Sequence, residues 1–152
     1  MPCKGNATGR QYDYQKESGK EDENMAAQNV LTQEQKERME KNGFNVAEAM
    51  QRFMNNEQLW IKFLKKFKLD TSFWELVKAM EEKDATKAFE ASHTLKGITG
   101  NLALSEFNKL VSEQTEYLRG TESNFEAAVS MMPQITEVYE NTTKIIDEVC
   151  GE

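Results

Sequence analysis

Histidine and cysteine are scarce in this chain of 152 residues. There is one histidine, His93, and there are two cysteines, Cys3 and Cys150, near opposite ends of the chain. A protein metal site needs several ligands, and one imidazole with two distant thiols does not have the spacing of any common ligand set. The cysteines also lack the spacing of a disulfide framework. The sequence therefore predicts no metal site, and we expect a reduced, cytoplasmic protein.

Long apolar runs are absent as well. No stretch approaches the ~20 apolar residues that span a bilayer, and no signal-peptide core follows the first residues. The formal net charge is −7, which is unfavourable for binding a nucleic-acid backbone, because phosphates attract basic patches. The one basic run, within residues 62–68, is interpreted as a solvated helix face. We expect neither a membrane nor a nucleic acid as a partner.

No segment shows the two-residue alternation of a β-strand, whereas apolar residues recur at helical spacing. Residues 1–28 are expected to form a disordered tail, because they bury too little apolar surface to offset their ordering entropy. Residues 29–152 are expected to form one helical domain. Short connections between long amphipathic helices favour antiparallel neighbours. The predicted fold is all-α: an up-down antiparallel four-helix bundle with one or two short N-terminal helices.

Capping residues predict where the helices begin and end. The run TQEQ at residues 32–35 has the form of a capping box that opens a short helix, which Gly43 ends. Asn101 tolerates the left-handed conformation and is expected to close the helix that contains the histidine. Pro133 either starts a new helix or kinks the last one. Other helices are expected to begin at Asn45, Ser72, Asp84 and Ser105, and within residues 123–126, and the apolar pattern strengthens from Asn56.

The residues around His93 are unusual for a helix. With about 100° per residue, the apolar side chains form one stripe centred on Leu95, and His93 points roughly 160° away from it, toward water. Lys96 at i+3, Gly97 at i+4 and Gly100 at i+7 border the imidazole. A glycine inside a helix costs about 1 kcal/mol relative to alanine. The helix thus loses stability to leave this imidazole uncovered.

An exposed imidazole beside bare backbone and an ammonium group is suited to carrying a phosphoryl group between proteins. Imidazole is nucleophilic near neutral pH, and phosphoryl transfer needs mainly positioning and neutralisation of charge. We predict that His93 is the phosphoacceptor and that Lys96 stabilises the charge of the phosphate. The missing side chains at Gly97 and Gly100 would give a partner steric access.

The same residues carry a family resemblance. The runs HTLKG at residues 93–97 and GNLAL at residues 100–104 resemble the signature of bacterial histidine-containing phosphotransfer (HPt) domains, and residues from about 44 to 148 follow that family's order of helices. The resemblance implies a four-helix bundle whose exposed histidine accepts a phosphoryl group from an aspartate of a response-regulator receiver domain, or returns it. A hybrid histidine kinase is a further candidate partner.

Individual positions follow from this resemblance. His93 matches the phosphorylated histidine, and Lys96 and Gly97 match the motif's lysine and glycine. The family's small apolar patch around the histidine makes Phe89 a candidate partner-binding residue, although sideways packing against another helix is an equal alternative. Ala103 departs from the usual glycine. The magnesium that such transfers use is expected on the receiver, so we expect no bound cofactor.

Other classes of protein fit less well. No residues remain for a nucleotide-binding domain with glycine-rich boxes, so we expect a phosphocarrier rather than an enzyme. A kinase dimerisation domain usually has proline five residues after its histidine, where this chain has Ile98. The main alternative is a non-catalytic helical adaptor in which the surface histidine is incidental. We expect a monomer, because one reactive histidine per bundle requires no symmetry. The sequence does not fix whether Gln114 and Arg119 point toward the histidine.

Overall fold

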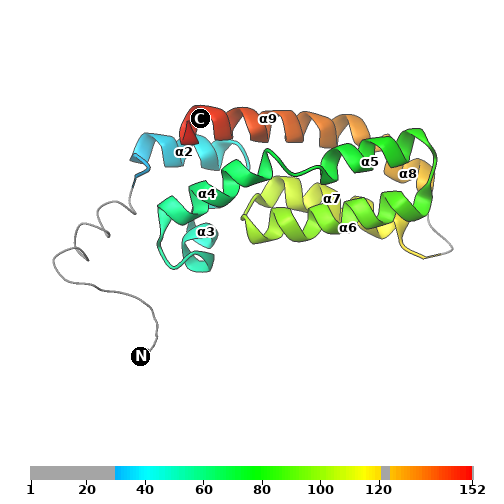
Figure 1. Ribbon diagram of the computed structural model, residues 1–152, viewed down its shortest axis with the longest axis horizontal. Coiled ribbons are helices and arrows are strands. Elements are labelled where there is room, and N and C mark those ends of the chain that lie inside the picture. Colours follow the sequence, from blue (N-terminus) through cyan, green and yellow to red (C-terminus); the bar gives the residue numbers. More distant parts are fainter. Residues whose placement is uncertain (1–29, 121–123, 152) are drawn as a thin grey trace, which may run out of the picture.

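The computed structural model describes residues 30–120 and 124–151, and the predicted disordered tail, residues 1–28, lies outside them. The described residues form α-helices with no β-strand among them, so the all-α prediction is confirmed (Figure 1). The helices are α2 (Gln33–Lys41), α3 (Val46–Arg52), α4 (Glu57–Phe67), α5 (Ser72–Glu81), α6 (Ala85–Asn101), α7 (Ser105–Leu118), α8 (Phe125–Ser130) and α9 (Met132–Cys150).

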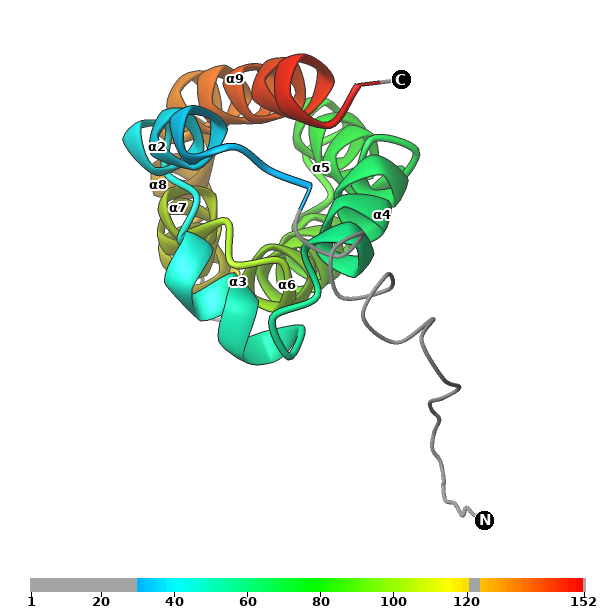
Figure 2. The ribbon, with the colours of Figure 1, turned by 90° about the vertical axis from the view of Figure 1, so that its left-hand side faces the viewer.

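Helix α6 lies between α5 and α7, and it packs against both along much of its length. Helix α9 contacts α2, α4, α7 and α8. Seen along the long axis, the helices surround a common centre (Figure 2). Large side chains from different helices are fully buried there, among them Trp60 of α4, Leu95 of α6, Phe107 of α7 and Ile145 of α9. A helical bundle with one hydrophobic core results.

The start of α2 is attached to the start of α4 by a buried carboxylate. Glu57 is only 2% exposed. Its carboxylate accepts a hydrogen bond from the Leu31 N–H at 2.9 Å and forms an ion pair with Lys36 Nζ at 2.6 Å. The predicted capping box at Thr32 is present, with reciprocal bonds to Gln35. Local hydrogen bonding therefore sets the direction of α2, and the Glu57 pair ties it to the bundle.

The chain breaks between α4 and α5, as expected, but the predicted cap at Ser72 is wrong. Ser72 is already inside the helix and buried, Thr71 is the N-cap, and the Ser72 N–H donates to Asp70 Oδ1 at 2.7 Å. The Glu75 N–H, which the Ser72 hydroxyl was expected to bind, donates instead to the Thr71 carbonyl at 2.9 Å. Pro133 lies in the first turn of α9, so it starts a helix rather than kinking one.

The basic run on α4 is partly solvated, as interpreted from the sequence. Lys62 and Lys66 are exposed, and the ammonium of Lys66 lies 5.2 Å from the ring centroid of Phe63. Lys68, however, pairs with Asp147 of α9. One member of the run therefore links two helices.

The end of α6 also differs from the sequence expectation. Asn101 is the last helical residue, and the left-handed residue is Ala103, with a φ of 59°. Its carbonyl accepts a hydrogen bond from the Asn45 N–H at 2.8 Å, and its side chain is 2% exposed. A left-handed conformation favours glycine, which explains in physical terms why glycine suits the position that Ala103 occupies.

Candidate functional site

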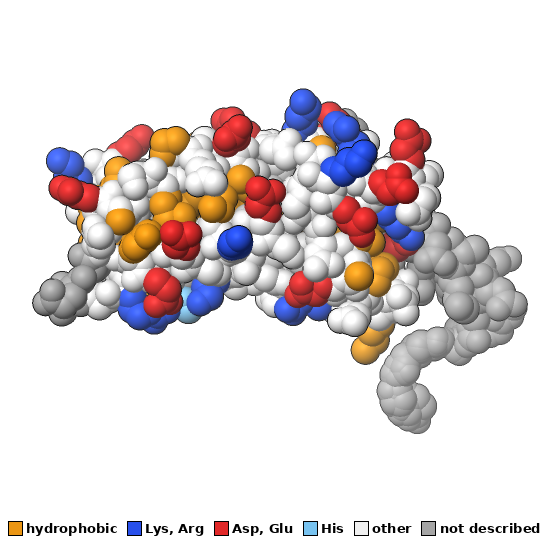
Figure 3. Space-filling model, turned by 180° about the vertical axis from the view of Figure 1, so that it is seen from behind, with side chains coloured by type: hydrophobic (Ala, Val, Ile, Leu, Met, Phe, Trp, Pro, Cys, Tyr) orange, Lys and Arg blue, Asp and Glu red, His pale blue; other side chains and the backbone are white. Residues whose placement is uncertain are grey.

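Helix α6 presents His93 to solvent. Asp84 caps the helix by accepting a hydrogen bond from the Lys87 N–H at 3.0 Å, as predicted. Leu95 and Ala88 are fully buried, whereas His93 is exposed on the opposite side of the helix. In Figure 3 the histidine (pale blue) lies at the surface beside basic and acidic side chains. The orientation expected from helical periodicity is therefore confirmed.

Buried polar side chains fix the rotation of α6 against α7. The hydroxyls of Ser92 and Thr115 are 2.7 Å apart, and the Thr115 hydroxyl donates to the Val111 carbonyl at 2.6 Å. The two hydroxyls therefore share a hydrogen bond that joins α6 to α7. Asn108 of α7 donates to the Lys96 carbonyl at 2.8 Å. Sequence reasoning gave Ser92 no role, yet this residue helps to keep His93 turned toward solvent.

Phe89 lies one turn before His93 and stacks on it. The ring centroids are 5.7 Å apart and the planes are inclined by 13°. Phe89 is half-buried and packs against the core. The ring packs against the core and also borders the imidazole, and its role in binding a partner stays a prediction.

Gly97 and Gly100 differ in what lies beside them. A Cβ added at Gly97 would meet nothing within 4 Å, so the helix surface beside His93 is open there. A Cβ at Gly100 would lie 3.2 Å from Nδ2 of Asn108. The lack of a side chain at Gly100 thus leaves room for the Asn108 amide, and steric access for a partner at Gly100 stays a prediction.

Lys96 and Arg119 both lie near one carboxylate, that of Glu116 on α7. The Arg119 guanidinium donates to Glu116 through Nη2 at 2.9 Å and through Nε at 3.1 and 3.2 Å. This hydrogen bond is the main reason that the pKa of Glu116 is lowered, and the charge of Lys96 adds to the effect. The same bond raises the pKa of Arg119 above its ordinary value.

Arg119 also contacts the aromatic pair. Its guanidinium carbon lies 5.3 Å from the ring centroid of Phe89, a distance typical of a cation–π interaction. One surface thus brings together the side chains of Phe89, His93, Lys96, Glu116 and Arg119, which we call the histidine face. The sequence left the direction of Arg119 open, and it gave no signal for Glu116 beyond its spacing of three residues from Arg119.

Gln114, the other residue left open, is not part of the histidine face. It is fully buried, and its amide donates to the Ala128 carbonyl at 3.0 Å and to the Met132 sulfur at 3.2 Å. Gln114 therefore joins α7 to α8 and α9.

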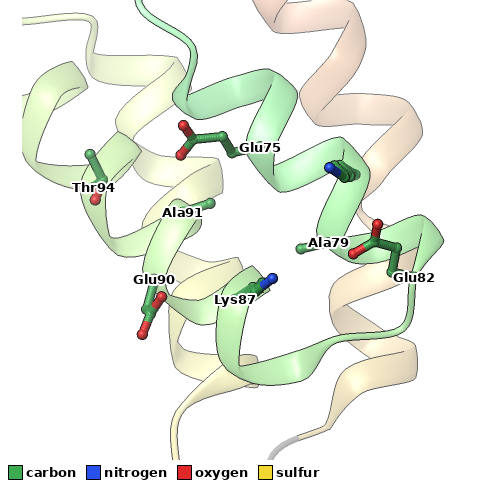
Figure 4. Close-up of a pocket in the computed structure, with 8 residues that line it drawn as sticks. Glu75, Ala79, Glu82, Lys87, Glu90, Ala91 and Thr94 are labelled. Carbon is green, nitrogen blue, oxygen red and sulfur yellow. The ribbon is translucent and has the colours of Figure 1, made fainter.

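A groove runs between α5 and α6 on the other flank of His93 (Figure 4). Small side chains, those of Ala79 and Ala91, leave it open, and the remaining lining residues are polar or charged. Glu90 and Thr94 of α6 belong to it and are sequence neighbours of the histidine. The lining is completed by Glu75, Lys78, Glu82 and Lys87.

Among residues 30–120 and 124–151, no group of three or more His, Cys, Asp or Glu side chains is placed to hold a metal ion. No helix in the same part of the chain is long and apolar enough to cross a membrane.

Comparison of this chain with family models, with curated proteins and with solved structures finds no match. The family resemblance therefore rests on the residues of its motif and on the order of its helices.

Proposed function

We propose that this protein is a phosphocarrier of a phosphorelay, in which His93 accepts a phosphoryl group from an aspartate of a response-regulator receiver domain or donates one to it. The observation that supports this most is the combination of an exposed imidazole with open helix surface at Gly97. A protein-bound acyl phosphate reaches a nucleophile only if both surfaces come close. An incidental histidine requires no such opening.

The transfer balances without a further reactant. The lone pair of an imidazole nitrogen attacks the phosphorus of the aspartyl phosphate, the N–P bond forms and the P–O bond breaks. The electron pair of the broken bond leaves with the aspartate carboxylate. The second ring nitrogen keeps its proton, so the product is a phosphoimidazolium, which passes the group on by the reverse reaction. Lys96 would neutralise charge on the phosphoryl oxygens.

The proposal includes the finer arrangement of the fold. Helices α5, α6, α7 and α9 would form the up-down antiparallel four-helix bundle implied by the resemblance, with α2 and α3 added at one end. The short connections at residues 82–84 and 102–104 support this, since they join helices that pack against each other. In such a bundle the partner would dock across α6 and its neighbours, with Phe89 at the edge of the contact.

The test is transfer of labelled phosphate. Candidate receiver domains are phosphorylated on aspartate, purified and mixed with this protein and with His93→Gln. We expect rapid appearance of acid-labile label on the wild type with at least one receiver, and none on His93→Gln. Label that stays on every receiver supports the alternative, a non-catalytic helical adaptor, and contradicts the proposal.

A further inference from the structure

On the histidine face, the carboxylate of Glu116 forms an ion pair with Arg119. Arg119 is hydrogen-bonded to Glu116 through both Nε and Nη2. The guanidinium that would bind a phosphate therefore already has a counter-ion.

Phe89 connects this ion pair to the imidazole. The Phe89 ring stacks on the imidazole of His93, and the guanidinium of Arg119 lies over the same phenyl ring. The guanidinium is thus no further from the imidazole than the sum of these two contact distances, 5.7 and 5.3 Å. The Arg119 side chain is half exposed, so its rotamer can change without disturbing the core.

Arg119 can leave Glu116 for another anion at little cost in stability. The side chains of Arg119 and Glu116 are 49% and 59% exposed, and exposed ion pairs contribute little to stability. A phosphoryl group carries more charge than a carboxylate and three acceptor oxygens, and arginine binds it with two parallel hydrogen bonds. A phosphoryl group on His93 would therefore compete well for Arg119.

We propose that Glu116 is a built-in competitor of the phosphoryl group: its carboxylate holds Arg119 in the unphosphorylated protein, and it lowers the affinity of the histidine face for phosphate. When His93 is phosphorylated, Arg119 turns to the phosphoryl oxygens and the released carboxylate repels them. Glu116 thereby favours onward transfer. The inference rests on the proposed function and adds to it a residue that regulates how long the phosphoryl group is kept.

The experiment uses phosphoramidate as a small donor, so that no receiver is needed. An imidazole nitrogen of His93 attacks the phosphorus, the P–N bond of the donor breaks, and ammonia leaves with its electron pair. Loading and decay are followed by intact mass. We expect Glu116→Gln to load about two- to fivefold faster than the wild type and to lose the group correspondingly more slowly, the range for an exposed ion pair.

Two matched variants separate this effect from a change in net charge or fold. Glu137→Gln on α9 removes one exposed carboxylate far along the sequence from the histidine face, and it should load like the wild type. In an Arg119→Gln background, the change Glu116→Gln should have a much smaller effect, because the cation that Glu116 holds is gone. The effect should also shrink at high salt.

The outcomes distinguish the two proposals. If the wild type does not load on His93, the proposed function fails and this inference fails with it. If the wild type loads and Glu116→Gln is unchanged or slower, or if Glu137→Gln gives the same increase, only the role of Glu116 is overturned.

Discussion

The phenyl ring of Phe89 lies nearly parallel to the imidazole of His93, one helical turn away and 5.7 Å between centroids. Because Phe89 is itself packed against the core, this contact restricts the imidazole without covering it. An exposed side chain is thereby given a defined orientation. This is the property that a phosphocarrier needs in a group that must meet a partner's aspartyl phosphate.

Replacing Phe89 with alanine should slow transfer from a receiver by about two- to tenfold, the range that corresponds to one aromatic pair. The imidazole would lose its stacking partner, and a docked receiver would lose an apolar contact. Stopped-flow transfer kinetics measure the effect. Phe63→Ala on α4 is the control, since Phe63 is 39% exposed but not part of the histidine face. An unchanged rate for Phe89→Ala would mean that the ring serves packing only.

Gly97 should show a conflict between stability and function. An added Cβ meets nothing within 4 Å, so Gly97→Ala should raise the free energy of unfolding by about 1 kcal/mol, the usual difference between these residues in a helix. Urea denaturation measures this. At Gly100 the amide of Asn108 is close, so Gly100→Ala should gain less or lose stability.

A larger side chain at the same position tests access. Gly97→Leu should slow transfer from a receiver by at least about tenfold, because small misplacements of reacting groups are costly. Loading from phosphoramidate should change little, since a small donor needs less room. Equal slowing with both donors would contradict the view that Gly97 provides access for a protein partner.

Glu57 should be important for stability and unimportant for transfer. It is 2% exposed, and it binds Lys36 and the Leu31 N–H. Glu57→Ala should lower the free energy of unfolding by about 3 kcal/mol, as expected when one partner of a buried ion pair is removed. Glu48→Ala removes an exposed pair with Arg52 and should cost much less. Similar losses in the two variants would contradict this interpretation.

The thiol of Cys150 should make the free energy of unfolding depend on pH. Burial raises the pKa of its thiol from 9.0 to about 11, and the charges of Lys65 and Lys68 offset part of this rise. Between about pH 9 and pH 11 the thiol is still protonated in the folded protein, whereas it is already ionised in the unfolded chain. Its contribution to stability is therefore complete below about pH 9 and is lost as the pH rises toward about 11.

Two measurements check this dependence. Alkylation of Cys150 at pH 9, located by peptide mass, should be at least about tenfold slower in the folded protein than in urea. Cys150→Ala should reduce the loss of stability above pH 9. Equal alkylation rates in the two states would show that the thiol is not protected.

Local hydrogen bonds made several features predictable from the sequence. The caps at Thr32, Asn45 and Asp84 each bind an N–H three residues later, so a short run of residues contains the whole interaction. The exposure of His93 was predictable for a similar reason, because helical periodicity alone separates it from the buried Leu95.

Features that depend on how two helices rotate against each other were not predictable. The position of Arg119 over Phe89 requires α7 to be fixed on α6 by the buried Ser92–Thr115 pair. The filling of the space at Gly100 requires Asn108 of α7 to face it. Neither relationship has a signature in the spacing of residues along one helix.

The most direct test of the account is phosphorus NMR of the protein after treatment with phosphoramidate. A single phosphohistidine resonance should appear, disappear after mild acid treatment, and be absent from His93→Gln. No phosphohistidine signal in the wild type, or an identical signal in His93→Gln, would contradict the assignment of His93 as the phosphoryl carrier.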